Sequence, residues 1–272
     1  MRILKLIRSF GKINKDYYKY AFIEIFLIII GILIALEVNN ANENRKLKLE
    51  EKKTLLAFHN EVSSSLLNLN LVLDKKRGIV NSDREILKYT GPNGRWNSEF
   101  KLDSLIYHVA TAGWRHVPQE GVLNEIINNG KLSIINDEKI KSQIASLPKA
   151  FSQILENDRI NRLYIKTYII PFLSKSTSLM NMTNFDKTFE YSNNSLGFTK
   201  FNFYEDDILK NREFENMLSW QSQYMKFGIE FLEKLKIKYV EIQKMIEIKY
   251  PDVDYKNLNE NLDRGVWNWR LF

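Results

Sequence analysis

One continuous hydrophobic run, residues 21–36, stands out against a chain whose other apolar positions are spaced among polar ones. Residues 25–36 of this run carry no polar side chain. Each Ile, Leu or Phe in such a segment favours membrane insertion by roughly 0.3–0.6 kcal/mol, so the run favours it by several kcal/mol. Glu24 opposes insertion, but its cost is small because it lies near the end of the run. The pattern predicts a membrane anchor.

The length of the run decides where the anchor begins and ends. A helix of about 16 residues reaches about 24 Å, which is short of the ~30 Å hydrocarbon core. Tyr17, Tyr18 and Tyr20 supply an interfacial aromatic belt on one side, and Val38 extends the other side. We therefore predict a transmembrane helix over residues 20–38. A cleaved signal peptide is the alternative, but no A-x-A site follows the run.

Basic residues gather before the run. Residues 1–19 contain a single acid, Asp16, and the basic residues Arg2, Lys5, Arg8, Lys12, Lys15 and Lys19. Under the positive-inside rule this segment stays in the cytoplasm, which predicts a single-pass protein of a bacterial inner membrane with a periplasmic domain. The same segment explains part of the net charge of +7. We expect no nucleic-acid binding, because no basic patch with stacking aromatic residues follows.

The small and polar residues of the anchor share one helical face. Glu24, Gly31, Ala35 and Asn42 lie on it together with Ile28. Gly31 and Ala35 form a small-xxx-small pair, which lets a second helix approach closely. An acid inside a membrane usually faces protein, not lipid. We predict a helix–helix contact here, in a homo-oligomer or with a partner membrane protein; a chance cluster of small residues is the alternative.

Helical periodicity continues from the anchor to about residue 89, where the turn 91–94 ends it. The predicted core-facing stripe is Leu55, Phe58, Val62, Leu66, Leu69 and Leu73. Shorter helices are expected next: one capped by Ser98 and ending near Gly113, and one over residues 119–129 that stops at Gly130. Residues 131–135 are expected to be extended.

The second half of the chain predicts two more long helical regions. Asn136 is expected to cap a helix with Pro148 at its boundary, followed by a helix over residues 149–175 that Pro171 kinks or ends. Residues 174–199 are predicted to form a long exposed loop. The apolar face of residues 149–175 is expected to hold Phe151, Ile154, Leu155, Ile160, Leu163, Tyr164 and Thr167.

A last long helix is predicted from Glu205 to just before Pro251, followed by an aromatic tail over residues 251–272. Its stripe is Phe214, Leu218, Gln221, Met225, Gly228, Leu232, Leu235, Tyr239, Ile242 and Ile246. The predicted fold class is all-α: one transmembrane helix continuous with a long helix of an extracytoplasmic antiparallel bundle over residues 39–250.

The chemistry-bearing residues are sparse. The chain has no cysteine, which excludes disulfides, thiolate metal sites and thiol catalysis. Its three histidines, His59, His108 and His116, belong to no metal or catalytic motif, and no phosphate-binding or nucleophile motif is present. We expect no enzyme activity, no cofactor and no metal.

One connection is richer than the others in mixed aromatic and polar side chains. It contains Trp114, Arg115, His116, Gln119 and Glu120 on a predicted loop. We predict a ligand or partner contact at this loop. The alternative is a helix connection whose tryptophan fills the end of the bundle.

Residues 22–43 and residues 129–136 form two motifs that occur together in a known family. The first resembles a GEI…GILIAL…NNWNE opening, with Ile23 at the usual Gly and Ala41 at the usual Trp, and the second resembles the second signature of the same family. This is an uncharacterised Bacteroidota family of single-pass membrane proteins of unknown function. The resemblance implies a cell-envelope location and assigns no catalytic or ligand residues. We expect a non-enzymatic scaffold or partner-binding module; a small-molecule sensor that signals through a partner is the alternative.

Overall fold

The computed structural model describes residues 15–185, 196–202 and 205–255. The secondary structure of this described part consists of helices, without strands, which confirms the predicted all-α class. By its internal contacts the chain divides into two units, residues 1–53 and 54–272. The first 14 residues of the basic segment, residues 186–195 of the predicted loop, and most of the aromatic tail lie outside the described residues.

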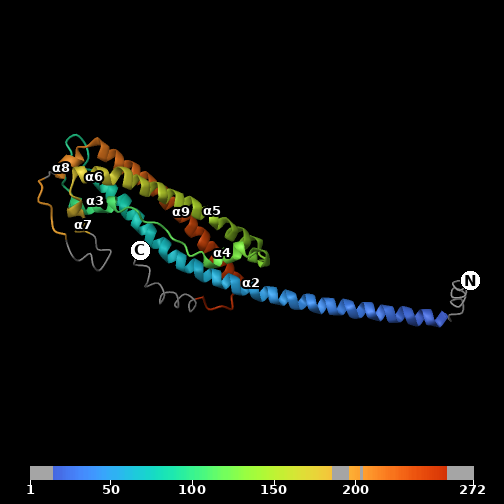
Figure 1. The fold of residues 1–272 in the computed structure, drawn as a ribbon. Helices are drawn as coiled ribbons and strands as arrows, with labels where there is room; N and C mark the ends of the chain where they lie inside the picture. Colours follow the sequence, from blue (N-terminus) through green and yellow to red (C-terminus); the bar gives the residue numbers. More distant parts are fainter. Residues whose placement is uncertain (1–14, 186–195, 203–204, 256–272) are drawn as a thin grey trace, which may run out of the picture. The chain divides into compact units, whose positions relative to one another are not determined.

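Helix α2 (Lys15–Leu87) begins in the first unit and ends in the second (Figure 1). Gly78 does not interrupt it; a Cβ there would meet nothing within 4 Å, so the position is open on its outer side. The predicted continuity of the apolar segment with a long helix is therefore correct, to within two residues of the expected end.

The second unit is a bundle of three long helices: the part of α2 after residue 53, α5 (Glu138–Tyr164) and α9 (Arg212–Lys249). His59 and Arg77 of α2 contact Glu247 and Glu233 of α9, so these two helices are antiparallel. Helix α5 is antiparallel to α9 as well, and α2 and α5 therefore run parallel (Figure 1). A return segment, residues 111–120, makes this parallel arrangement feasible.

Short helices close the bundle. They are α3 (Leu102–Ala110), α4 (Gly121–Asn128), the 3₁₀ helix η2 (Lys131–Ile134), the π-helix η3 (Ile165–Ile169), α6 (Ile170–Ser176), α7 (Leu179–Thr183) and α8 (Glu205–Leu209). Two hydrophobic clusters fill the interior. One is built around the start of α5 and the end of α9, and the other around α3, α6 and the start of α9.

The predicted stripe of the last helix is confirmed, since all ten of its residues are buried on α9. That helix is broken, however: α8 ends at Leu209 and α9 begins at Arg212 after its cap, Asn211. The stripe of α2 is buried except for Leu66, which is half-buried.

Several helix boundaries differ from expectation. Ser98 does not cap α3; its hydroxyl donates to Glu85 Oε1 at 2.9 Å, and α3 begins only at Leu102. Gly130 ends its helix with a φ of 74°, as expected, but the segment that follows is the 3₁₀ helix η2 and is not extended. The cap of α5 is Asp137, which accepts hydrogen bonds from two backbone N–H groups of the first turn. The predicted cap at Asn136 is therefore wrong by one residue.

The two prolines of the α5 region act differently. Pro148 lies inside α5, because buried Leu147 and Phe151 on either side hold the helix in place despite its missing hydrogen bond. Pro171 lies in the first turn of α6, directly after the π-helix η3. A proline cannot donate to the preceding turn and would clash with it, and the wider π turn accommodates both effects. The predicted loop 174–199 starts late, because α6 and α7 occupy its first part.

The expected apolar face of α5 is partly wrong. Leu155, Leu163 and Thr167 are exposed, whereas Asn157, Asp158 and Asn161 are buried. The core-facing side of this helix is polar near its C-terminal end.

Candidate functional site

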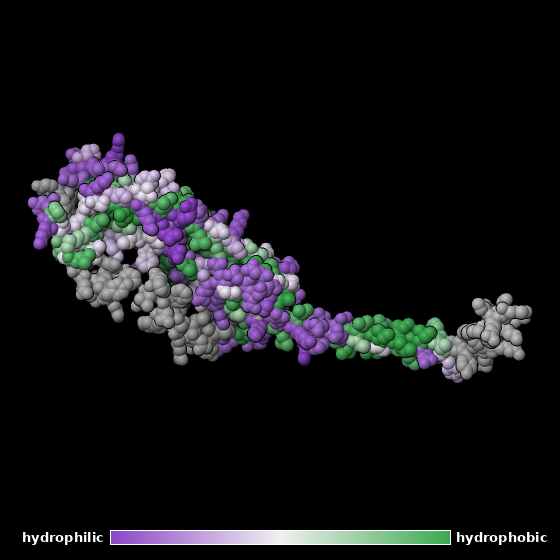
Figure 2. All heavy atoms as spheres, in the orientation of Figure 1, coloured by the Kyte–Doolittle hydropathy of each residue, from purple (hydrophilic) through white to green (hydrophobic). Residues whose placement is uncertain are grey.

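Helix α2 is the one helix of the described chain that is long and apolar enough to cross a membrane. None of the residues of its apolar window is buried by the rest of the protein. Figure 2 shows this segment as a band of hydrophobic spheres followed along the helix by hydrophilic ones. Such a band suits contact with lipid, because its hydrophobic side chains have no protein cover.

The four residues of the predicted membrane contact lie on α2. Glu24, Gly31, Ala35 and Asn42 are all exposed, and a Cβ on Gly31 would meet nothing within 4 Å. In a straight α-helix they fall within an arc of about 40°. The face is therefore uncovered and continuous, and the contact itself stays a prediction.

The loop singled out in the sequence is the return segment of the second unit. His116 is buried and its Nδ1 lies 2.8 Å from Asn68 Oδ1 on α2. The backbone N–H of Gln119 donates to Ser65 Oγ at 3.0 Å, one helical turn closer to the start of α2. These bonds hold the segment along α2, with Gln119 exposed. Burial lowers the pKa of His116 to about 4, so its ring is neutral near pH 7.

The other three residues of this loop do not converge on one cavity. Trp114 packs against both hydrophobic clusters, with Lys75 Nζ 5.0 Å from its ring centroid. Arg115 is exposed, and Glu120 is the residue before α4. Trp114 thus fills a junction between the two clusters, and ligand binding at this loop stays a prediction.

A buried polar layer, which sequence reasoning missed, separates the two clusters. Lys76 Nζ donates to Asp158 Oδ1 at 2.7 Å, and both side chains are almost fully buried. Gly228 of α9 lies against the pair: a Cβ there would be 2.7 Å from Asn157 Oδ1 and 3.2 Å from Lys76 Nζ. Burial raises the pKa of Asp158, and the neighbouring Lys76 opposes this shift.

The neighbourhood of this layer is rich in acceptors without a hydrogen-bond partner among the described residues. These atoms are Asp83 Oδ1 and Oδ2, Asn157 Oδ1, Asp158 Oδ2, Asn161 Oδ1 and Gln221 Oε1. Burial raises the pKa of Asp83 well above its usual range, opposed by the positive charge of Lys226. Buried groups of this kind commonly hold ordered water. Within the described residues, no cluster of three His, Cys, Asp or Glu side chains forms a metal site.

A surface groove, the aromatic groove, lies between the C-terminal end of α5 with η3 and the first half of α9. It has a volume of about 690 Å³ and is lined by Tyr164, Tyr168, Glu213, Asn216, Met217, Ser219, Trp220 and Gln223. The rings of Tyr164 and Tyr168 are 5.3 Å apart, and those of Tyr164 and Tyr224 are 6.2 Å apart. Trp220 meets Tyr224 edge-on at 5.5 Å. Four rings therefore follow one another along this surface.

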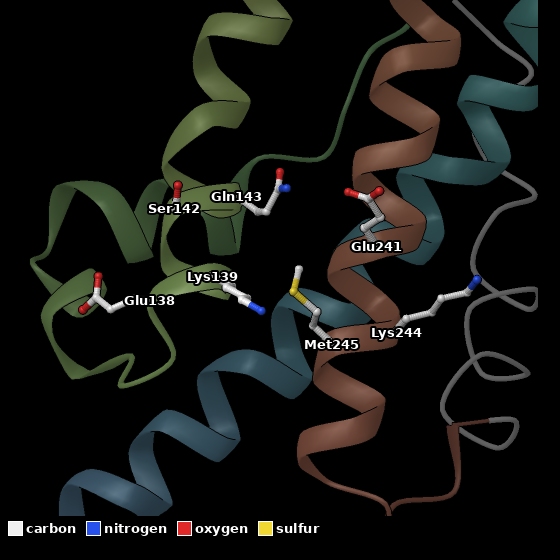
Figure 3. Close-up of a pocket in the computed structure, with 7 residues that line it drawn as sticks. All are labelled: Glu138, Lys139, Ser142, Gln143, Glu241, Lys244 and Met245. Carbon is white, nitrogen blue, oxygen red and sulfur yellow. The ribbon is translucent and has the colours of Figure 1, made fainter.

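A second groove of about 530 Å³ lies between the start of α5 and the last turns of α9. Figure 3 shows Lys139 and Met245 pointing into the gap, whereas Glu138 and Lys244 point away from it. The charges of its two acids, Glu138 and Glu241, and its two lysines cancel, and Glu138 is already paired with Lys141 at 3.2 Å. The lining of this groove therefore has no net charge that would select a ligand.

Comparisons with known proteins found no match: no family model, no curated protein and no solved structure is significantly similar to this chain.

Proposed function

We propose that this protein is a non-enzymatic, membrane-anchored module of the bacterial cell envelope that binds a partner protein. Its domain lies on the periplasmic side of the inner membrane and its N-terminus in the cytoplasm. The observation that carries the proposal is the continuity of α2. One helix contains the uncovered apolar segment and also supplies Leu55 and Phe58 to the core of the folded domain. The basic N-terminus and the resemblance to the Bacteroidota family support the location.

Topology is tested by labelling single cysteines in the full chain, which has none of its own. Asn128→Cys lies on the exposed surface of α4, and Ser9→Cys lies in the basic segment. In cells with a permeabilised outer membrane, an impermeant maleimide is expected to label Asn128→Cys and to spare Ser9→Cys. The opposite pattern would overturn the orientation, and release of the chain by alkaline carbonate would overturn the anchor.

Partner binding is tested by cross-linking in native membranes. The proposed contact face includes Gly31, so Gly31→Leu is expected to abolish the cross-linked species because the larger side chain keeps the second helix away. Leu33→Phe enlarges a side chain on the opposite side of the helix and is the matched control. A cross-linked species insensitive to Gly31→Leu would place the contact elsewhere.

The second candidate function is a small-molecule sensor, and the aromatic groove favours it. A sensor binds its ligand in the purified chain without a partner protein. A scaffold instead retains a membrane partner during purification in mild detergent.

A further inference from the structure

The aromatic groove is shaped by a break in helical regularity. Tyr164 is the last residue of α5, and Tyr168 belongs to the π-helix η3, in which the N–H of Ile170 donates to Ile165 O. Single π turns occur frequently at functional sites. This turn brings two tyrosine rings onto the surface that faces the start of α9, and it keeps Tyr168 about half exposed.

The four neighbouring aromatic rings form a continuous surface against which a ligand can pack. Trp220 and Tyr168 are each 54% exposed, whereas Tyr164 and Tyr224 are half-buried behind them. Exposed aromatic rings that cluster in one patch commonly mark binding sites. The volume lies within the usual range for small-molecule sites, roughly 300–1,000 Å³.

The charge of the groove is opposite to that of the whole chain. Glu213 is the single charged residue of its lining, although the chain carries a net charge of +7. No ion pair of Glu213 occurs within the described ranges, and its side chain is exposed. Burial, the phenols of Tyr224 and Tyr168, and then the Glu213 carboxylate raise the pKa of Tyr164. The Glu213 carboxylate therefore exerts its electrostatic effect in the same groove that the aromatic rings line.

We propose that the aromatic groove binds a small organic cation, a quaternary ammonium or guanidinium compound. Its positive group lies in the space lined by Trp220, Tyr168 and the Glu213 carboxylate. Aromatic faces attract such cations through their quadrupole, and a carboxylate beside them adds Coulomb attraction. An anion would be repelled by Glu213. A neutral ligand would gain stacking but nothing from the charge. The proposal rests on the sensor candidate and does not depend on the anchor or on a partner protein.

The test measures binding to the purified full chain in lipid nanodiscs by ligand-observed NMR and calorimetry. The probes are choline, tetramethylammonium and methylguanidinium, together with 3,3-dimethyl-1-butanol, the neutral analogue of choline. At least one cation is expected to bind, and choline is expected to bind more tightly than its neutral analogue. Trp220→Ala and Glu213→Gln are each expected to weaken cation binding about three- to thirtyfold.

The matched control is Phe227→Ala, which removes an exposed aromatic ring from the same helix outside the groove. It is expected to leave binding unchanged. Circular dichroism of every variant identifies any that fails to fold, and Tyr168→Ala then serves as the second groove variant. Equal binding of choline and its neutral analogue, no binding of any cation at 10 mM (about the weakest range of specific small-ligand affinity), or equal loss in Phe227→Ala would overturn the proposal. Each of these results leaves the topology and cross-linking tests of the anchored module unaffected.

Discussion

Lys76 of α2 and Asp158 of α5 form an ion pair of 2.7 Å in the middle of the bundle, with side chains 1% and 2% exposed. The two residues are 82 positions apart and lie between two hydrophobic clusters. A pair of this kind fixes which positions of the two parallel helices stand opposite one another. Any other register leaves a buried charge without its partner, which is energetically costly.

Removing one partner of this pair is expected to destabilise the domain strongly. Asp158→Leu leaves a buried ammonium group uncompensated, and such losses are typically about 3–5 kcal/mol. The double variant Lys76→Met with Asp158→Leu removes both charges and is expected to recover most of that loss. Denaturation of the full chain in detergent micelles measures the free energy of unfolding. A double variant as unstable as the single one would show that the charges do not act as a pair.

Gly228 and Gly78 form a natural comparison. A Cβ at position 228 would lie 2.7 Å from Asn157 Oδ1, whose side chain is itself buried, so Gly228→Ala is expected to cost about 1–3 kcal/mol of stability. A Cβ at position 78 meets nothing, and Gly78→Ala is expected to add about 0.5–1 kcal/mol because alanine favours helix. Thermal unfolding of the two variants checks both signs, and equal shifts would contradict the close approach of α9.

The sequence predicted α9 well because its buried stripe follows helical spacing along 33 consecutive residues, from Phe214 to Ile246. It predicted the core-facing side of α5 poorly. Asn157, Asp158 and Asn161 point inward, and a hydrophobic pattern assigns such residues to solvent. Their partners are distant in sequence and cannot be assigned from spacing alone: Asp158 pairs with Lys76, Asn157 donates to Tyr224 O, and Asn161 donates to Ala112 O.

The same limit of prediction from sequence applies to the two surface sites, the Gly31 face and the aromatic groove. The apolar segment and its Gly31 face are local features, and the sequence alone indicated them. The aromatic groove joins η3 to α9, residues about fifty positions apart, and depends on a π turn. The one local sign was Pro171, which predicted a kink but not the rings that the kink brings to the surface.

Stability is expected to depend on pH through His116. Burial lowers the pKa of its ring to about 4 in the folded chain, whereas an unfolded chain binds a proton below about 6.5. The unfolded state therefore takes up more protons between these values. The contribution of His116 to the free energy of unfolding is complete above pH 6.5. It is lost as the pH drops toward 4, which lowers the free energy of unfolding by on the order of 3 kcal/mol.

The comparison for this dependence is His116→Gln, whose side chain carries an amide in place of the ring and does not titrate. Its curve of unfolding free energy against pH is expected to be flatter between pH 6.5 and 4 than that of the parent chain. Burial also lowers the pKa of His108, whose contribution has the same sign and is present in both proteins. Parallel curves for the two proteins would contradict a buried neutral His116.

Helix α4 is capped by a residue of another helix. Its own N-cap, Glu120, makes no capping bond through its side chain. Instead Glu61 of α2 accepts hydrogen bonds from the backbone N–H groups of Val122 at 2.6 Å and Leu123 at 2.8 Å. Glu61→Ala leaves these donors unpaired and is expected to cost about 1–3 kcal/mol.

Glu61→Gln keeps one acceptor oxygen but turns an amide N–H₂ toward the second donor, so its loss of stability is expected to be intermediate. Glu241→Ala removes an exposed glutamate from α9 and is expected to change stability by less than about 0.5 kcal/mol. Hydrogen exchange locates the effect, because the amides of Val122 and Leu123 should exchange faster in Glu61→Ala before the rest of the domain opens. Unchanged protection of these two amides would mean that α4 is held by its buried Leu123 and Ile126 and not by the carboxylate.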